Sequence, residues 1–117
     1  MKANILGTEY EIKKVEYEDD YLNDTKSIGC CDLKNKNIII LNIENDERYK
    51  YDDDYSKQMT IKEILRHEIL HAFLFESGLN DSSLILDSAW ARNEEMIDWF
   101  AIQSPKIYKV YKDLDLL

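Results

Sequence analysis

The chain has 117 residues and a formal net charge of −9, with 44% hydrophobic and 33% charged residues. This length allows a modest core but not two domains, so we expect a single compact domain over residues 1–117. The composition is that of a globular chain rather than a disordered one. The negative charge argues against a nucleic-acid backbone or an anionic membrane as the main partner.

Two further features of the composition point to a cytoplasmic, unprocessed protein. No stretch approaches the roughly 18 apolar residues of a membrane-spanning helix, and residues 1–17 lack the apolar core of a signal peptide. Cys30 and Cys31 are adjacent, and a disulfide between neighbours would be strained, so we expect reduced thiols. No CxxC spacing is present to suggest a cysteine metal site.

The first half of the sequence predicts strands. Residues 5–17 mix β-branched and aromatic residues with charges, which predicts one half-buried strand. Residues 28–33 and 37–43 flank a short polar turn and predict a β-hairpin. The run 38–41 is apolar without alternation, so we expect that strand to be covered on both faces. The many charged residues between positions 44 and 56 predict a loop there.

The second half predicts helices. Thr60 and Glu63 fit a capping box, so we expect a helix from Thr60 to about Ser77, with Gly78 as its stop. This helix is apolar nearly all round, which predicts a central, buried position.

Residues 89–103 predict a second helix, and Ser104 followed by Pro105 predicts the beginning of a third. Together the elements predict an α+β fold. A small antiparallel sheet, made of the N-terminal strand and the hairpin, would pack on the central helix and two further C-terminal helices.

The two histidines of the chain lie in one pentapeptide of the pattern HExxH, His67 to His71. On a helix they share a face and can converge on one metal ion, while Glu68 is offset toward a water bound to that ion. This is the general-base arrangement of zinc metallopeptidases. The other interpretation, two histidines present for packing or solvation, is disfavoured by their spacing and by the glutamate after the first.

A catalytic zinc site needs a third protein ligand and an open position, and the sequence has no third histidine. We expect a carboxylate of the second helix, either Glu94 or its neighbour Glu95. Glu94 is favoured because Asp98 lies one turn further along the same face, where it can orient a ligand histidine. A solvated surface charge is the alternative for each of these carboxylates.

At these residues the sequence resembles the gluzincin metallopeptidases. Their HExxH is followed, on a second helix, by an Asn-Glu pair with an Asp four residues after the Glu, which Asn93, Glu94 and Asp98 match. The small size is similar to that of the minigluzincins. The resemblance implies zinc held by His67, His71 and Glu94, with Glu68 as the catalytic base.

A second resemblance is to the phage-associated IrrE/ImmA-type metallopeptidases, in which a Phe-Ala pair follows the ligand glutamate, as Phe100 and Ala101 do here. The chain departs from that type at Ile69 and Leu70, where a small residue is usual. The substrate-binding domain and the oxyanion-stabilising histidine of larger gluzincins are also absent. A tyrosine could replace that histidine, and the candidates are Tyr49, Tyr51, Tyr55 and Tyr108.

We therefore expect zinc-dependent hydrolysis of a peptide bond in one or a few intracellular protein substrates. Zinc would make hydroxide available near neutral pH, and Glu68 would take the proton of the attacking water and pass it to the leaving amine. The resembled families pair an extended substrate with an edge strand beside the active-site helix. Here that edge would be residues 38–43 or 28–33.

Two alternatives remain open at this point. The chain could be a non-catalytic zinc-binding module, a phage-type accessory protein that binds a protein partner without cutting it. It could also be a latent enzyme whose residues 109–117 lie in its own cleft. The oligomeric state and the substrate are not encoded in any motif of the sequence.

Overall fold

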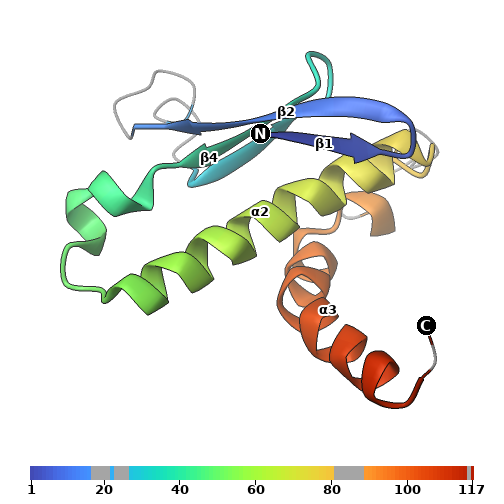
Figure 1. Ribbon diagram of the computed structural model, residues 1–117. Coiled ribbons are helices and arrows are strands. Elements are labelled where there is room, and N and C mark those ends of the chain that lie inside the picture. Colours follow the sequence, from blue (N-terminus) through green and yellow to red (C-terminus); the bar gives the residue numbers. More distant parts are fainter. Residues whose placement is uncertain (17–21, 23–26, 81–88, 116) are drawn as a thin grey trace.

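The computed structural model describes residues 1–16, 22, 27–80, 89–115 and 117. It confirms the α+β class: a four-stranded sheet forms one layer, and the long helix α2 (Asp54–Glu76) runs across one face of it (Figure 1). Helix α3 (Glu94–Asp113) packs against α2 and continues away from the sheet. The central position predicted for the HExxH helix is therefore correct, but the prediction that this helix is buried was wrong for most of its residues. Of the 23 residues of α2, those that are buried are Ile61, Ile64, Glu68, Ala72 and Leu74.

The N-terminal region forms two strands rather than the single one predicted. Strands β1 (Lys2–Ile5) and β2 (Thr8–Val15) pair in antiparallel fashion. Leu6 and Gly7 connect them with φ values of 50° and 92°. The side chain of Asn4 accepts a hydrogen bond from the Gly7 amide at 2.9 Å. A two-residue turn with positive φ at both positions is the tight connection that suits a hairpin.

The predicted second hairpin is confirmed, as β3 (Gly29–Asp32) paired antiparallel with β4 (Asn37–Leu41). The strand order is β1-β2-β4-β3, and β4 pairs with β2 in parallel. The sheet is therefore mixed, and the prediction of an antiparallel sheet was wrong. Strand β4 of this hairpin lies next to β2, so β3 forms the edge of the sheet. All apolar residues of β4 are buried, as predicted from their continuous run.

The central helix begins earlier than predicted. Asp53 is its N-cap and accepts a hydrogen bond from the Ser56 amide at 2.7 Å. Thr60 is inside the helix, where its hydroxyl donates to the Ser56 carbonyl at 3.0 Å. The predicted loop over 44–56 contains instead the short helix η2 (Glu47–Tyr49), the end of η1 (Ile43–Asn45) and the first turn of α2. Between the helix end expected at Gly78 and the second helix expected from residue 89, residues 81–88 lie outside the described part.

The C-terminal region forms one long helix, not two. A short turn, η3 (Trp90–Arg92), precedes Asn93, whose side chain accepts a hydrogen bond from the Met96 amide at 2.9 Å and so caps α3. Pro105 lies inside α3. A proline cannot donate to the carbonyl four residues back, which is that of Ala101. Arg66 of α2 donates to this carbonyl instead, through Nε at 2.6 Å.

The far end of α2 is fastened to the sheet by Glu76. Its carboxylate accepts hydrogen bonds from Thr8 Oγ1 at 3.0 Å, from the Tyr10 hydroxyl at 2.7 Å and from Lys36 Nζ. Lys36 lies in the β3–β4 turn with φ 59° and covers the Phe75 ring at 4.5 Å. These hydrogen bonds, with Lys36 first, hold the pKa of Glu76 below its ordinary value.

We expect Arg66→Met to lower the free energy of unfolding by about 1–3 kcal/mol, because it leaves the buried Ala101 carbonyl without its donor. In a Pro105→Ala background the new amide can serve that carbonyl, so the same substitution should cost less. Urea unfolding of the two single variants and the double variant measures this coupling. Strictly additive losses would contradict the compensation.

We expect Glu76→Gln to destabilise the protein near neutral pH and to do so less in acid. A carboxyl whose pKa is lowered by folding stabilises the protein above its unfolded-state pKa, and this contribution is lost as the pH falls through the folded-state value. Urea unfolding at about pH 7 and at about pH 3 tests this, with Glu47→Gln as the solvent-exposed control. An equal loss at both pH values would show that the charge of Glu76 is not the cause.

Candidate metal centre

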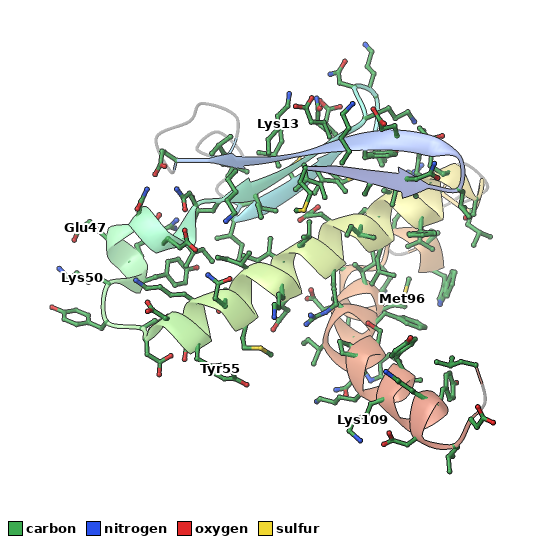
Figure 2. The ribbon with its side chains drawn as sticks, in the orientation of Figure 1. Lys13, Glu47, Lys50, Tyr55, Met96 and Lys109 are labelled. Atoms are coloured by element: carbon green, nitrogen blue, oxygen red, sulfur yellow. The ribbon has the colours of Figure 1, made fainter. Side chains whose placement is uncertain are left out.

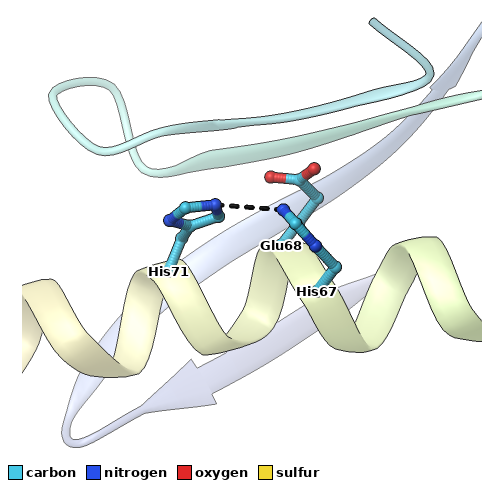
Figure 3. Close-up of side chains that lie close together, drawn as sticks. All are labelled: His67, Glu68 and His71. Carbon is cyan, nitrogen blue, oxygen red and sulfur yellow. Dashed lines mark hydrogen bonds between the residues drawn. The ribbon is translucent and has the colours of Figure 1, made fainter. Parts of the chain in front are cut away.

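The two histidines of the HExxH motif face the same side of α2. His67 Nε2 and His71 Nε2 are 3.1 Å apart, and ligand atoms of His67, Glu68 and His71 all lie within 4.8 Å of one another. Figure 3 shows both rings and the Glu68 carboxylate on the side of α2 that faces the β3–β4 hairpin. This group could hold a metal ion.

Helix α3 brings a carboxylate to both histidines. Glu94 is the first residue of α3, and its Oε2 lies 3.1 Å from His67 Nε2 while its Oε1 lies 3.4 Å from His71 Nε2. Glu95 lies elsewhere, in a separate surface depression with Trp90, Asn93, Met96 and Trp99. The structure therefore brings Glu94 to the histidines and not its neighbour.

Asp98 lies one turn after Glu94 and contacts the other side of the His67 ring, with Oδ1 2.7 Å from Nδ1. A carboxylate at this distance accepts the proton of Nδ1, so a neutral His67 carries its lone pair on Nε2. That lone pair faces His71 and Glu94. Burial lowers the pKa of His71, which favours the neutral, ligand form of its ring.

The distances among these three groups are those of groups that could share one metal ion, with a different Glu94 oxygen near each histidine. Ligand atoms about 2.0–2.1 Å from an ion, at tetrahedral angles, lie about 3.3 Å from one another. The three separations among His67 Nε2, His71 Nε2 and the Glu94 oxygens are 3.1, 3.1 and 3.4 Å. A protonated imidazole ring paired with Glu94 and Asp98 would make the same contacts without a metal ion. Measuring the metal content of the protein therefore distinguishes a metal site from an ion pair.

Glu68 is the buried member of the group, with 6% of its surface exposed. Burial raises its pKa to about 7; Glu94 and Asp98 add to this rise and His67 opposes it. Its carboxylate lies against the backbone of Gly29 in β3. A Cβ at Gly29 would stand 2.8 Å from Glu68 Oε1 and 2.7 Å from Ile64 Cγ2. The edge strand thus approaches the site as closely as a glycine permits.

Gly29 is the residue of this site that the sequence analysis missed. The available signal was a glycine inside a segment of strand character, which often marks a close approach of two backbones. Neither of the cysteines beside it, Cys30 and Cys31, forms a disulfide, in agreement with the expected reduced thiols. Burial, with Glu68 as the next cause, raises the pKa of Cys31 to about 12. Cys31 is therefore a thiol, not a thiolate ligand, near neutral pH.

The outer edge of β3 borders a groove along α2. The Ile28 carbonyl accepts from the Leu41 amide at 2.9 Å. Because backbone groups alternate sides along an antiparallel pair, those of Gly29 and Cys31 point to the open edge. Two adjoining cavities of about 470 and 360 Å³ lie here, and both are lined by Gly29, His67 and Glu68. Of the two substrate edges expected, only the β3 segment is an edge, since β4 lies inside the sheet.

The expected tyrosine is not found among the described residues that line the two cavities. Tyr55 is 74% exposed in the first turn of α2 (Figure 2), and Tyr51, just before this helix, is 90% exposed. Tyr108 is exposed on α3, and Tyr49 packs against the sheet core. The expected plug is also absent from the groove as far as it is described: Lys109 lies about 22 Å along α3 from Glu94.

Comparison with known proteins gave no match to any family model, curated protein or solved structure. Among the described residues, no helix is long and apolar enough to cross a membrane. The function proposed below therefore depends on the geometry of the site.

Proposed function

We propose that the chain is a zinc-dependent peptidase of gluzincin type that cuts a peptide bond in one or a few cytoplasmic protein substrates. One observation carries the proposal. His67, His71 and Glu94 converge at the separations of metal ligands, beside a buried carboxylate and beneath an open strand edge.

Zinc is the metal that this ligand set favours. Two imidazoles and one carboxylate with a fourth position open are the usual composition of a catalytic zinc site. When bound, zinc would lower the pKa of a coordinated water and polarise the scissile carbonyl.

The roles of the protein groups follow from their positions. Glu68 is offset from the histidine Nε2 atoms and faces the strand edge, where it would accept the proton of the attacking water and return it to the leaving amine. Asp98 would hold the His67 ring in its ligand orientation. The outward backbone groups of Gly29 and Cys31 would pair with an extended substrate and hold its scissile bond over Glu68.

A second candidate, a zinc-binding module that holds a partner without cutting it, is supported by the surface of α3. Large apolar side chains are exposed there, and they are Trp99, Phe100, Ile102, Tyr108 and Tyr111. Exposed apolar side chains can take part in a protein interaction site. Under this alternative zinc would be bound, but no substitution at Glu68 would change a measurable activity.

We expect Glu94→Ala to weaken zinc binding by more than the ~10–100-fold expected for Asp98→Ala, because Glu94 would contact the ion and Asp98 only a ligand of it. Glu95→Ala is the matched control and should leave binding unchanged. Competition with a chelating dye measures the affinities, and atomic emission the stoichiometry of one zinc per chain. Loss of zinc on Glu95→Ala with retention on Glu94→Ala would reverse the assignment.

We expect Glu68→Gln to reduce peptide hydrolysis by about 10²–10⁴-fold while zinc content and thermal stability are kept. The amide retains the shape of the carboxylate but cannot accept the proton. Hydrolysis of a proteome-derived peptide library, followed by mass spectrometry, measures activity, and His71→Ala should lose both zinc and activity. Full activity in Glu68→Gln would remove Glu68 from the reaction, and loss of zinc there would make it a ligand.

A further inference from the structure

The larger of the two cavities is lined by both apolar and polar groups, as the binding of a long basic side chain requires. It lies beside the N-terminal half of α2 and has a volume of about 470 Å³. Ile28 and Ile64 supply apolar wall, while Glu63 and Thr60 supply polar groups. Lysine and arginine bury an apolar stem and keep a charged head at a polar rim. A cavity lined by aliphatic side chains and by carboxylates, among them the exposed Glu63, suits both parts.

The charges around the groove are of one sign. Four carboxylates line the two cavities, and no described lysine or arginine does; the carboxylates are those of Glu63, Glu68, Glu94 and Asp98. A divalent ion would offset two of these four formal charges. The groove therefore attracts cationic segments and repels acidic ones.

Glu63 is the carboxylate of this set that is available to a ligand. Glu94 and Asp98 contact His67, and Glu68 is buried beside Gly29. Glu63 is exposed, and it forms no ion pair with any residue that the structure describes. Its position one turn before His67 on α2 places it beside the reacting centre rather than on it.

The direction of the edge strand decides which part of a substrate meets this cavity. Gly29 at the beginning of β3 lines both cavities, Ile28 lines the larger one, and Leu33 beyond the end of β3 lines the smaller one. Antiparallel pairing is the more stable way to add a strand. A substrate paired in this way runs opposite to β3, so residues that follow its scissile bond lie at the larger cavity.

We propose that this cavity receives a lysine or arginine side chain that directly follows the scissile bond, and that Glu63 is the specificity-determining residue. The inference rests on the proposed peptidase function and adds the class of substrate. The smaller cavity, with Cys30, Cys31 and Leu33 in its wall, faces the residues before the scissile bond and lacks a free carboxylate of this kind among the described residues.

The test compares the full-length wild type with Glu63→Gln, Glu63→Arg and Glu95→Gln, each with added zinc, on a proteome-derived peptide library. Mass spectrometry of the new N-termini reports the residue after each cut. We expect lysine and arginine to be enriched about threefold to tenfold in wild type and in the Glu95→Gln control, which removes the same charge outside the groove. Glu63→Gln should lose the enrichment, and Glu63→Arg should shift it to aspartate and glutamate.

Failure of this inference and failure of the proposed function give different results. Cleavage without enrichment of basic residues, or enrichment that persists in Glu63→Gln, would overturn the role of Glu63 but not the proposed peptidase function.

If the wild type cuts no peptide, the proposed peptidase function fails, and the subsite is tested by peptide binding alone. Two fluorescein-labelled pools of random hexapeptides, one with a fixed arginine and one with a fixed glutamate, are then titrated against Glu68→Gln and the Glu63→Gln/Glu68→Gln double variant. Equal affinity for both pools in the first protein would overturn the subsite.

Discussion

The register of α3 on α2 decides what the site contains. Consecutive residues of α2 each contact α3: Arg66 donates to the Ala101 carbonyl, and His67 contacts both Glu94 and Asp98. Adjacent residues on a helix point about 100° apart, so a shift of α3 by one residue would carry Glu94 away and bring Glu95 no closer to the same geometry. Pro105 has no amide hydrogen to donate, so the Ala101 carbonyl accepts from Arg66 instead, and this hydrogen bond fixes the register of α3 on α2.

The same junction explains how α2 carries His67, Glu68 and His71 where it lies between the sheet and α3. A buried charge is costly unless it has a partner, and α2 alone offers none. His67 and His71 obtain carboxylates from α3, whose first turn also benefits from acidic residues because of the helix dipole. Glu68 lies on the same side of α2 but is covered by β3, and burial raises its pKa to about 7. Strand β3 and helix α3 therefore each complete part of one site.

The parts of this arrangement that depend on local spacing could be predicted from the sequence. The shared face of His67 and His71, and that of Glu94 and Asp98, follow from the helical period alone. The β3–β4 hairpin follows from two apolar runs and a polar turn. Glu94 was favoured over Glu95 because it precedes Asp98 by four residues, about one helical turn, and the structure places Glu94 and Asp98 beside His67.

The parts that were wrong depend on groups distant in the sequence or on equivalent local signals. Pro105 indicates the beginning of a helix, but it lies inside α3, where Arg66, 39 positions earlier, donates to the carbonyl that the proline cannot serve. Asp53 and Thr60 are both acceptable N-caps, and the structure uses the first. Parallel pairing of β2 with β4 depends on how the hairpin enters the sheet, which no local pattern encodes.

The placement of β3 links the fold to the kind of substrate that the proposed function can serve. An open strand edge is an aggregation hazard that proteins usually shorten or cover. β3 has four residues, and its outward groups at Gly29 and Cys31 lie beside acidic side chains of α2 and α3. This edge can pair with one short extended segment, and its negative surroundings repel a second copy of this acidic chain. Under the proposed function, a substrate would have to present an unpaired, extended and cationic stretch, such as a loop or terminus, because a folded strand has its backbone groups already engaged.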